Sequence, residues 1–200
     1  MVGPRISGGL VNLRSVTDSD LTRRVEWLND PETVRLFTGT LPDRRYDMFD
    51  AQRWRHSTEN DPLTLVWSIE TKGERHIGDV DIHDIRRTEG LARLTILIGN
   101  KEYWGRGFGT DSVMTLLKYA FDEMRLNAVN LRVCDFNRRA IRCYEKCGFE
   151  KVESSPHIPG WQPGDIFVTA TKERFAALRT DGKFVHAAQP GSFVQHHTSP

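Results

Sequence analysis

The spacing of apolar and polar residues changes along this 200-residue chain, and each spacing predicts a different element. Apolar residues three and four positions apart are typical of helices, whereas strict alternation is typical of half-buried strands. Thr17 and Asp20 have the spacing of a helix cap, and Pro31 suits a first helical turn. The elements predicted for the N-terminal part are a strand over 10–16 and helices over 18–28, 32–37 and 48–59.

Alternation dominates the middle of the chain. Residues 64–70 and 75–85 alternate on either side of a turn at 71–74, which predicts a β-hairpin. A further strand is predicted over 91–99. One face of the 75–85 strand is polar and contains Asp79, Asp81 and His83.

The helical period returns at Thr110, where Val113, Leu116 and Leu117 begin one apolar stripe. The elements predicted from there on are a helix from 110 to about 124, a strand over 129–133, a helix over 137–147 ended by Gly148, and strands over 149–152 and 166–171. The order of helices and strands predicts a mixed α/β fold with a run of antiparallel strands.

Length and charge narrow the class of protein. Two hundred residues suit one domain, which we place at 10–172, with an extension at 1–9 and a partly disordered tail at 173–200. The 28 basic and 27 acidic residues give a net charge of +1, so we expect neither nucleic acid nor a membrane as partner. With no signal pattern, we expect a cytoplasmic protein. The cysteines Cys134, Cys143 and Cys147 are predicted to be reduced, and no metal site is expected.

Three glycines at every second position, Gly105, Gly107 and Gly109, lie between the 91–99 strand and the helix from Thr110. Glycine lets a backbone approach a ligand closely, and the N–H groups of a following helix attract an anion. The loop therefore predicts a phosphate-binding site, although a tight turn without a ligand is the alternative. It lacks the lysine of a nucleoside triphosphate loop and the spacing of a dinucleotide loop, which leaves coenzyme A.

Two segments resemble the GNAT superfamily of N-acetyltransferases, and in particular its RimJ/RimL-like branch of ribosomal-protein-alanine acetyltransferases. Residues 92–110 resemble the coenzyme-binding strand and diphosphate loop, with Trp104 where that branch commonly has tryptophan. Residues 135–149 resemble the signature Asn-x-x-Ala-Ile-x-x-Tyr-Glu-Lys-x-Gly-Phe, and 26–32 resemble acceptor-side helices of the branch. The resemblance implies a central, mostly antiparallel twisted sheet flanked by helices, and acetyl transfer from acetyl-CoA to a primary amine.

The same resemblance implies where the coenzyme binds. Backbone N–H groups of the 96–98 strand would polarise the thioester carbonyl, and those of 106–110 would hold the diphosphate. Asn137 would contact the pantetheine arm. The expected coenzyme-binding residues are Ile96, Leu97, Ile98, Trp104, Gly105, Arg106, Gly107, Phe108, Gly109, Thr110 and Asn137.

Catalysis by direct attack in a ternary complex needs groups that handle protons. Tyr144 is the predicted donor to the leaving thiolate, and its alternative role is to complete an apolar stripe with Ile141 and Cys147. His83 with Asp81 is the predicted base, with Asp84 and Glu89 as weaker candidates and a water relay as the alternative. An acyl-cysteine route is not expected, because no cysteine has a His/Asp partner pattern.

The acceptor side is predicted from the helices before residue 40. The candidate residues are Trp27, Asn29, Arg35 and Phe37, although Trp27 and Phe37 equally suit a helix core. The turn-rich segment 157–165 is a candidate lid. The acceptor is expected to be a protein N-terminus or a small-molecule amine such as an amino sugar. A homodimer is left open, and the alternative function is a non-catalytic acyl-CoA-binding module.

Overall fold

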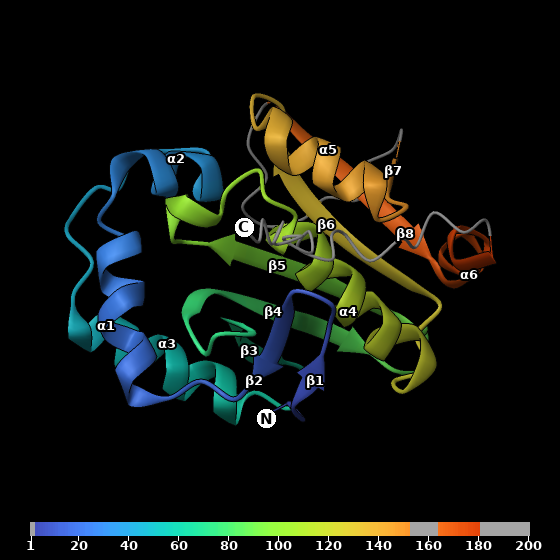
Figure 1. Ribbon diagram of the computed structural model, residues 1–200, viewed down its shortest axis with the longest axis horizontal. Helices are drawn as coiled ribbons and strands as arrows, with labels where there is room; N and C mark the ends of the chain where they lie inside the picture. Colours follow the sequence, from blue (N-terminus) through green and yellow to red (C-terminus); the bar gives the residue numbers. More distant parts are fainter. Residues whose placement is uncertain (1–2, 153–163, 181–200) are drawn as a thin grey trace, which may run out of the picture.

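The computed structural model describes residues 3–152 and 164–180 (Figure 1). Its elements are β1 (Ile6–Ser7), β2 (Val11–Arg14), α1 (Asp18–Trp27), α2 (Pro31–Thr38), α3 (Met48–Asn60), β3 (Leu65–Thr71), β4 (His76–Arg86), β5 (Leu91–Ile98), η1 (Lys101–Tyr103), α4 (Phe108–Asp122), β6 (Ala128–Cys134), α5 (Arg138–Lys146), β7 (Glu150–Lys151), β8 (Asp165–Thr171) and α6 (Lys172–Thr180).

The strands form one sheet in the order β1-β2-β3-β4-β5-β6-β8-β7. Every neighbouring pair is antiparallel except β5 and β6, which are parallel. These two strands pair only over Leu91–Arg93 and Ala128–Asn130, and they diverge beyond that point. The predicted mostly antiparallel sheet with flanking helices is confirmed, and its one parallel pair leaves a gap that positions the site described below.

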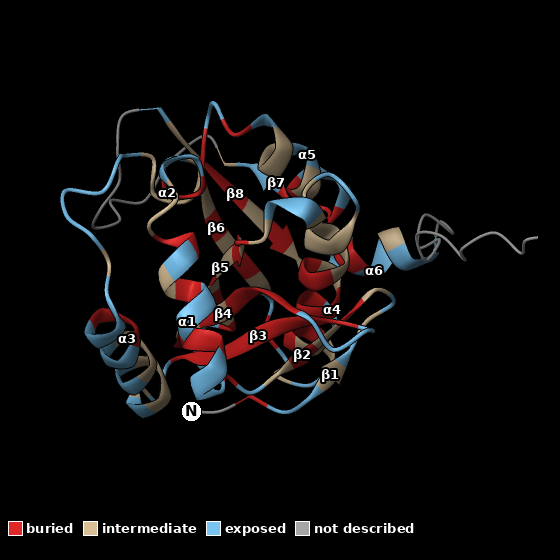
Figure 2. Ribbon diagram, turned by 60° about the vertical axis from the view of Figure 1, so that its left-hand side comes forward, coloured by how far each residue is buried: buried red, intermediate tan, exposed pale blue. Residues whose placement is uncertain are grey.

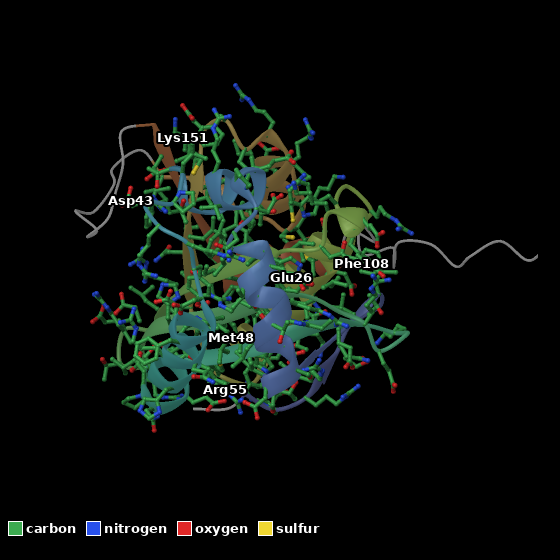
Figure 3. All side chains as sticks on the ribbon, turned by 90° about the vertical axis from the view of Figure 1, so that its left-hand side faces the viewer. Glu26, Asp43, Met48, Arg55, Phe108 and Lys151 are labelled. Carbon is green, nitrogen blue, oxygen red and sulfur yellow. The ribbon has the colours of Figure 1, made fainter. Side chains whose placement is uncertain are left out.

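Helices cover both faces of the sheet. On one face α4 packs on the strands through Leu116 and Phe121, and Phe175 of α6 stacks on Phe121 with ring centroids 5.3 Å apart. On the other face Leu21 of α1 and Ala51 of α3 pack against β3. Figure 2 shows that β3 is buried along its whole length, and Figure 3 shows α1 in front of the sheet with α3 beside it. The core therefore has two layers, one on each side of the sheet.

The strands and helices predicted from residue spacing are found within a few residues of their expected bounds. The long helix starts at Phe108 rather than Thr110, because Gly107 is already its N-cap. The two-residue strand β1 was not predicted; it pairs with β2, and backbone N–H groups of Gly9, Leu10 and Val11 donate to Asp111 of α4. The tail was predicted to begin at 173, but residues 172–180 form α6, whose Phe175 packs in the core. Residues 181–200 lie outside the described residues.

A buried charged cluster fastens α1 to the sheet. The Asp20 carboxylate accepts two hydrogen bonds from the Arg14 guanidinium, at 2.6 and 2.9 Å, and one from Ser68. Arg24 donates to Asp79 at 2.7 Å, and His76 lies between Asp20 and Asp79. Burial, the largest single influence, would raise the pKa of Asp20, but the hydrogen bonds from Arg14 and Thr17 and the nearby His76 together outweigh burial and hold this pKa well below its ordinary range.

This depressed pKa predicts how stability changes with pH. The stabilisation from ionised Asp20 is complete well above the unfolded pKa, about 3.9, and is lost as the pH falls toward the lower folded value. We therefore expect the free energy of unfolding to fall between pH 5 and pH 2.5, and to fall less steeply in Asp20→Asn. Urea unfolding across this range measures the slope. Asp18→Asn, at an exposed residue of the same helix, is the control, and an equal slope in D20N and wild type would contradict the assignment.

Candidate active site

A cleft of about 570 Å³ opens where β5 and β6 part. Its walls are the diverging strands, the glycine loop with the first turn of α4, one face of α5, and one face of α2. The lining residues that matter below are Thr33, Phe37, Thr38, His83, Arg93, Ile96, Leu97, Ile98, Trp104, Gly107, Gly109, Thr110, Arg132, Asn137, Arg139, Arg142, Cys143, Tyr144 and Lys146. Most of the coenzyme-side candidates thus lie in one cleft with Tyr144 and His83.

The glycine loop at the end of β5 has the backbone of an anion site. Gly105 and Gly107 have φ values of +70° and +89°, a region that glycine adopts without strain. The N–H of Asp111 bonds to the carbonyl of Gly107 at 2.9 Å. The N–H groups of residues 108–110 precede that bond, so they have no partner within the helix and lie at the positive end of its dipole.

Gly109 is the one glycine of the three that lies inside α4. A Cβ there would approach Ile98 at 3.7 Å and Cys143 at 3.8 Å, which are ordinary contact distances. A side chain at this position would therefore not disturb the fold, but it would occupy cleft space beside the free N–H groups.

Trp104 anchors the loop to the strand that precedes it. Its indole Nε1 donates to the carbonyl oxygen of Ile98 at 2.6 Å, and the Arg139 guanidinium lies 3.6 Å from the ring centroid. Trp104 lines the cleft, as predicted, but its indole N–H donates to the Ile98 carbonyl within the protein. Trp104 therefore positions the loop in addition to forming part of the cleft wall.

Arg106 and Phe108, predicted to bind the coenzyme, do not line the cleft. The Arg106 guanidinium turns back to the carbonyl of Glu102 at 3.1 Å, and Phe108 packs edge-on against Tyr103 with centroids 4.9 Å apart. Only their backbone N–H groups remain candidates for the diphosphate.

Near the glycine loop the positive charge of the cleft comes instead from α5, through Arg139, Arg142 and Lys146. These three residues were not predicted as site residues. Their spacing of three and four residues places them on one helical face, which was a readable signal.

Asn137, expected to contact the pantetheine arm, makes hydrogen bonds within the protein through both polar atoms of its side chain. Its Oδ1 accepts from the N–H of Ala140 at 3.1 Å and so caps α5, and its Nδ2 donates to the carbonyl of Leu36 at 3.0 Å. The residue lines the cleft. Its side chain therefore ties α5 to α2 and fixes the width of the cleft.

Tyr144 lines the cleft from α5 and is buried against Phe149, with ring centroids 5.6 Å apart. Burial raises the pKa of its phenol above the ordinary value, so the group stays protonated across the neutral range. Tyr144 therefore packs in the core and also reaches the cleft, and its role as donor to the thiolate stays a prediction. The neighbouring Cys143 thiol accepts from Thr110 Oγ1 at 3.4 Å, and no hydrogen bond to a histidine or carboxylate is found for it among the described residues.

His83 and Asp81 lie together, as the alternation of β4 predicted. His83 Nδ1 is 2.7 Å from Asp81 Oδ1, and His83 lines the cleft. The carboxylate orients the ring and leaves the other ring nitrogen available. Asp84 and Glu89, weaker candidates for a base, instead pair with Arg86 in the β4–β5 turn.

Of the four predicted acceptor residues only Phe37 lines the cleft, and Trp27, Asn29 and Arg35 do not. Trp27 is buried in the helix core with its ring 4.9 Å from that of His76, which corrects its functional assignment. Asn29 exchanges hydrogen bonds with the backbone of Tyr46, at 2.7 and 3.0 Å, and so clamps a loop. Arg35 points to the outer side of α2, with its guanidinium 5.0 Å from the Phe136 ring centroid.

The face of α2 that does line the cleft presents Thr33, Leu36, Phe37 and Thr38. The candidate lid 157–165 falls mostly outside the described residues.

Comparison with known proteins agrees with this geometry. The family model described as "Acetyltransferase (GNAT) domain" matches residues 11–150. The chain belongs to the GNAT acetyltransferase family. It is 27% identical over 186 residues to an aminoglycoside N(6')-acetyltransferase type 1 of Klebsiella pneumoniae, covering 87% of this chain and 89% of the relative. The GNAT assignment makes the chain an N-acetyltransferase.

Solved structures of GNAT proteins have the same fold. AAC(6')-Ib in complex with ribostamycin and coenzyme A superposes with a TM-score of 0.71 at 25% identity, over 86% of this chain and 99% of that one. A spermidine N-acetyltransferase from Vibrio cholerae in complex with CoA and spermine has a TM-score of 0.70 at 20% identity, over 84% and 98% of the two chains. At that identity the second likeness establishes the fold alone.

Neither a cluster of metal-ligating side chains nor a membrane-spanning helix is found in the described part of the chain. Across residues 3–152 and 164–180, no group of three or more His, Cys, Asp or Glu side chains is arranged to hold a metal ion. In the same part of the chain no helix combines the length and the apolar character needed to span a membrane.

Proposed function

We propose that the cleft between β5 and β6 binds acetyl-CoA and a primary amine together, and that the acetyl group passes directly between them. The observation on which this proposal rests is the junction of the diverging strands with the glycine loop. Three helix N–H groups without helical partners, at residues 108–110, end a cleft lined by the α5 cations Arg139, Arg142 and Lys146. The two phosphoryl groups of coenzyme A suit that end, because N–H groups and cations both stabilise anions.

The proposed position of the diphosphate determines where the pantetheine arm of the coenzyme would run. The loop follows Ile98 directly, so a pantetheine arm attached to the diphosphate runs back along β5 toward the point where the strands part. Alternate residues of a strand direct their N–H groups to opposite sides. Beyond Arg93 the side of β5 that faces β6 has no strand pairing. Backbone groups of Ile96, Leu97 and Ile98 on that side are the proposed partners of the arm and of the thioester carbonyl.

Acetyl transfer then needs one bond to form and one to break. The neutral amine nitrogen attacks the thioester carbonyl carbon, the carbon–sulfur bond breaks, and the amine loses a proton. Tyr144, kept protonated by burial, is the proposed hydrogen-bond donor to the leaving thiolate. His83, oriented by Asp81, is the proposed acceptor of the amine proton.

The finer assignments remain predictions from the sequence. The acceptor is proposed to be a small-molecule amine or a protein N-terminus, and the two relatives named above act, by their names, on aminoglycosides and spermidine. The RimJ/RimL-like branch is supported by Trp104, whose indole fastens the loop to Ile98. Residues 10–172 are proposed as the catalytic domain. We also propose a cytoplasmic location and a homodimer.

An amine panel tests the proposal. The purified protein is incubated with acetyl-CoA and about twenty primary amines, including short peptides, amino sugars, amino acids and polyamines, and both free CoA thiol and acetylated product are measured. We expect thiol release that depends on the amine and matches a mass gain of one acetyl group. Binding of acetyl-CoA without transfer to any amine would favour a non-catalytic module.

A further inference from the structure

Arg93 lies at the closed end of the cleft. It is the last residue of β5 that pairs with β6, where its partner is Asn130, and it stands opposite His83 in the register of β4 and β5. Cross-strand partners share a face of the sheet, so the guanidinium and the imidazole lie on the same side. Both side chains line the cleft. Arg93 is therefore placed beside the proposed base, on the side where the amine must arrive.

The guanidinium of Arg93 has no partner among the described residues. Its Nε is buried and makes no hydrogen bond, and no ion pair involves this side chain. The other arginine of that end, Arg132, is held by Asp165 at 2.7 Å. Buried donors without a partner are rare in native proteins, and arginine is charged at every relevant pH. Arg93 as a whole is only partly buried, so its guanidinium can be reached from the cleft, and its buried Nε without a partner indicates that a ligand supplies acceptor oxygens.

The charge of the cleft determines the kind of ligand. The described lining includes the cations Arg93 and Arg132 at the acceptor end and neither Asp nor Glu. Asp81, on the same strand face, is already hydrogen-bonded to His83. We infer, on the basis of the proposed function, that the acceptor amine bears an oxyanion, a carboxylate or a phosphate, which Arg93 binds through its planar fork of donors.

This inference separates the protein from the acceptors named for its relatives. Spermidine and aminoglycosides have several ammonium groups, and each would meet the Arg93 guanidinium without a carboxylate in the described lining to compensate. Like charges in a partly buried site repel, so polycations are expected to be poor acceptors. Arg93 is accordingly a specificity-determining residue, and its effect should appear in the choice between acceptors more than in the chemical step.

The experiment compares matched amines that differ only in the anion. Amino acids and short peptides are paired with their carboxyl-amidated forms, and glucosamine 6-phosphate is paired with glucosamine; spermidine and kanamycin form a cationic arm. We expect at least one anionic amine to have kcat/KM about tenfold or more above that of its neutral partner, as a charged hydrogen bond provides. The carboxylate and phosphate pairs show which oxyanion is bound.

Variants assign the preference to Arg93. Arg93→Gln is expected to reduce the anionic-to-neutral ratio of kcat/KM to about one, mainly through KM, and Arg93→Lys should restore part of it. Arg45→Gln, at an exposed arginine outside the cleft, is the matched control and should leave the ratio unchanged. CoA affinity and the melting temperature of each variant verify that the fold and the coenzyme end are intact.

The possible outcomes distinguish failure of the oxyanion inference from failure of the proposed function. Equal rates for anionic and neutral partners, a preference for the cationic arm, or an unchanged ratio in R93Q would overturn the oxyanion inference while leaving the acetyltransferase intact. Absence of transfer to every amine in all arms would overturn the proposed function and this inference with it.

Discussion

Replacing Gly109 with valine is expected to raise the dissociation constant for CoA by at least about tenfold without lowering the melting temperature. The Cβ would stand 3.7 Å from Ile98 and 3.8 Å from Cys143, so the fold accepts it. Its methyl groups would extend into the space beside the free N–H groups of residues 108–110 and separate them from a diphosphate. Losing one charged hydrogen bond costs roughly 1.5–3 kcal/mol, and each 1.4 kcal/mol is a factor of ten.

Calorimetric titration with CoA measures this effect, and Gly109→Ala should give a smaller loss. Because alanine favours a helix over glycine, G109A is expected to melt no earlier than wild type. Gly73→Val is the matched control, since Gly73 lies in the β3–β4 turn and its nearest neighbour to a Cβ is Thr71 at 3.8 Å. Unchanged CoA affinity in both Gly109 variants would mean that the coenzyme does not use the first turn of α4.

Tyr144→Phe is expected to lower kcat by about 10²–10³-fold and to leave CoA affinity nearly unchanged. The substitution removes only the phenol oxygen, so the ring keeps its contact with Phe149. Without the phenol, the leaving thiolate loses its proposed hydrogen-bond donor, and only the transition state is affected. Steady-state kinetics with the best acceptor from the amine panel, together with CoA titration, measures the two effects separately.

Tyr119→Phe is the control for this experiment. Tyr119 lies on α4, packs edge-on against Trp67 with centroids 5.8 Å apart, and does not line the cleft. Its loss should leave kcat within about twofold. If Y144F retains wild-type kcat, Tyr144 acts only as a core residue and the donor to the thiolate is another group or water.

The fold could be predicted from the sequence because its elements have clear local patterns. The stripe of Val113, Leu116 and Leu117 predicted α4, and the alternation of β4 placed Asp81 and His83 on one face. The strand β1 was missed because two residues give no period. The sequence also did not reveal that β3 is buried on both faces. The helices α1 and α3 cover its polar side, and these contacts join residues far apart in the sequence.

The coenzyme end and the acceptor end of the site also differed in how far the sequence predicted them. The coenzyme end depends on consecutive residues, so Gly105 and Gly107 could be identified from their spacing, and both adopt positive φ. The acceptor end is assembled from three strands and α2, and no local pattern indicated that Arg93 would face His83. Side-chain direction was the other source of error, because a residue type does not reveal that Arg35 points to the outer side of α2.

The central claim is that the first turn of α4 holds the diphosphate of the coenzyme at the end of a cleft between β5 and β6. A crystal structure of the protein with bound CoA tests it most directly. The account predicts diphosphate oxygens about 2.7–3.2 Å from the backbone nitrogens of Phe108, Gly109 and Thr110, with the pantetheine arm along β5. Coenzyme density elsewhere on the protein, with this turn vacant, would contradict it.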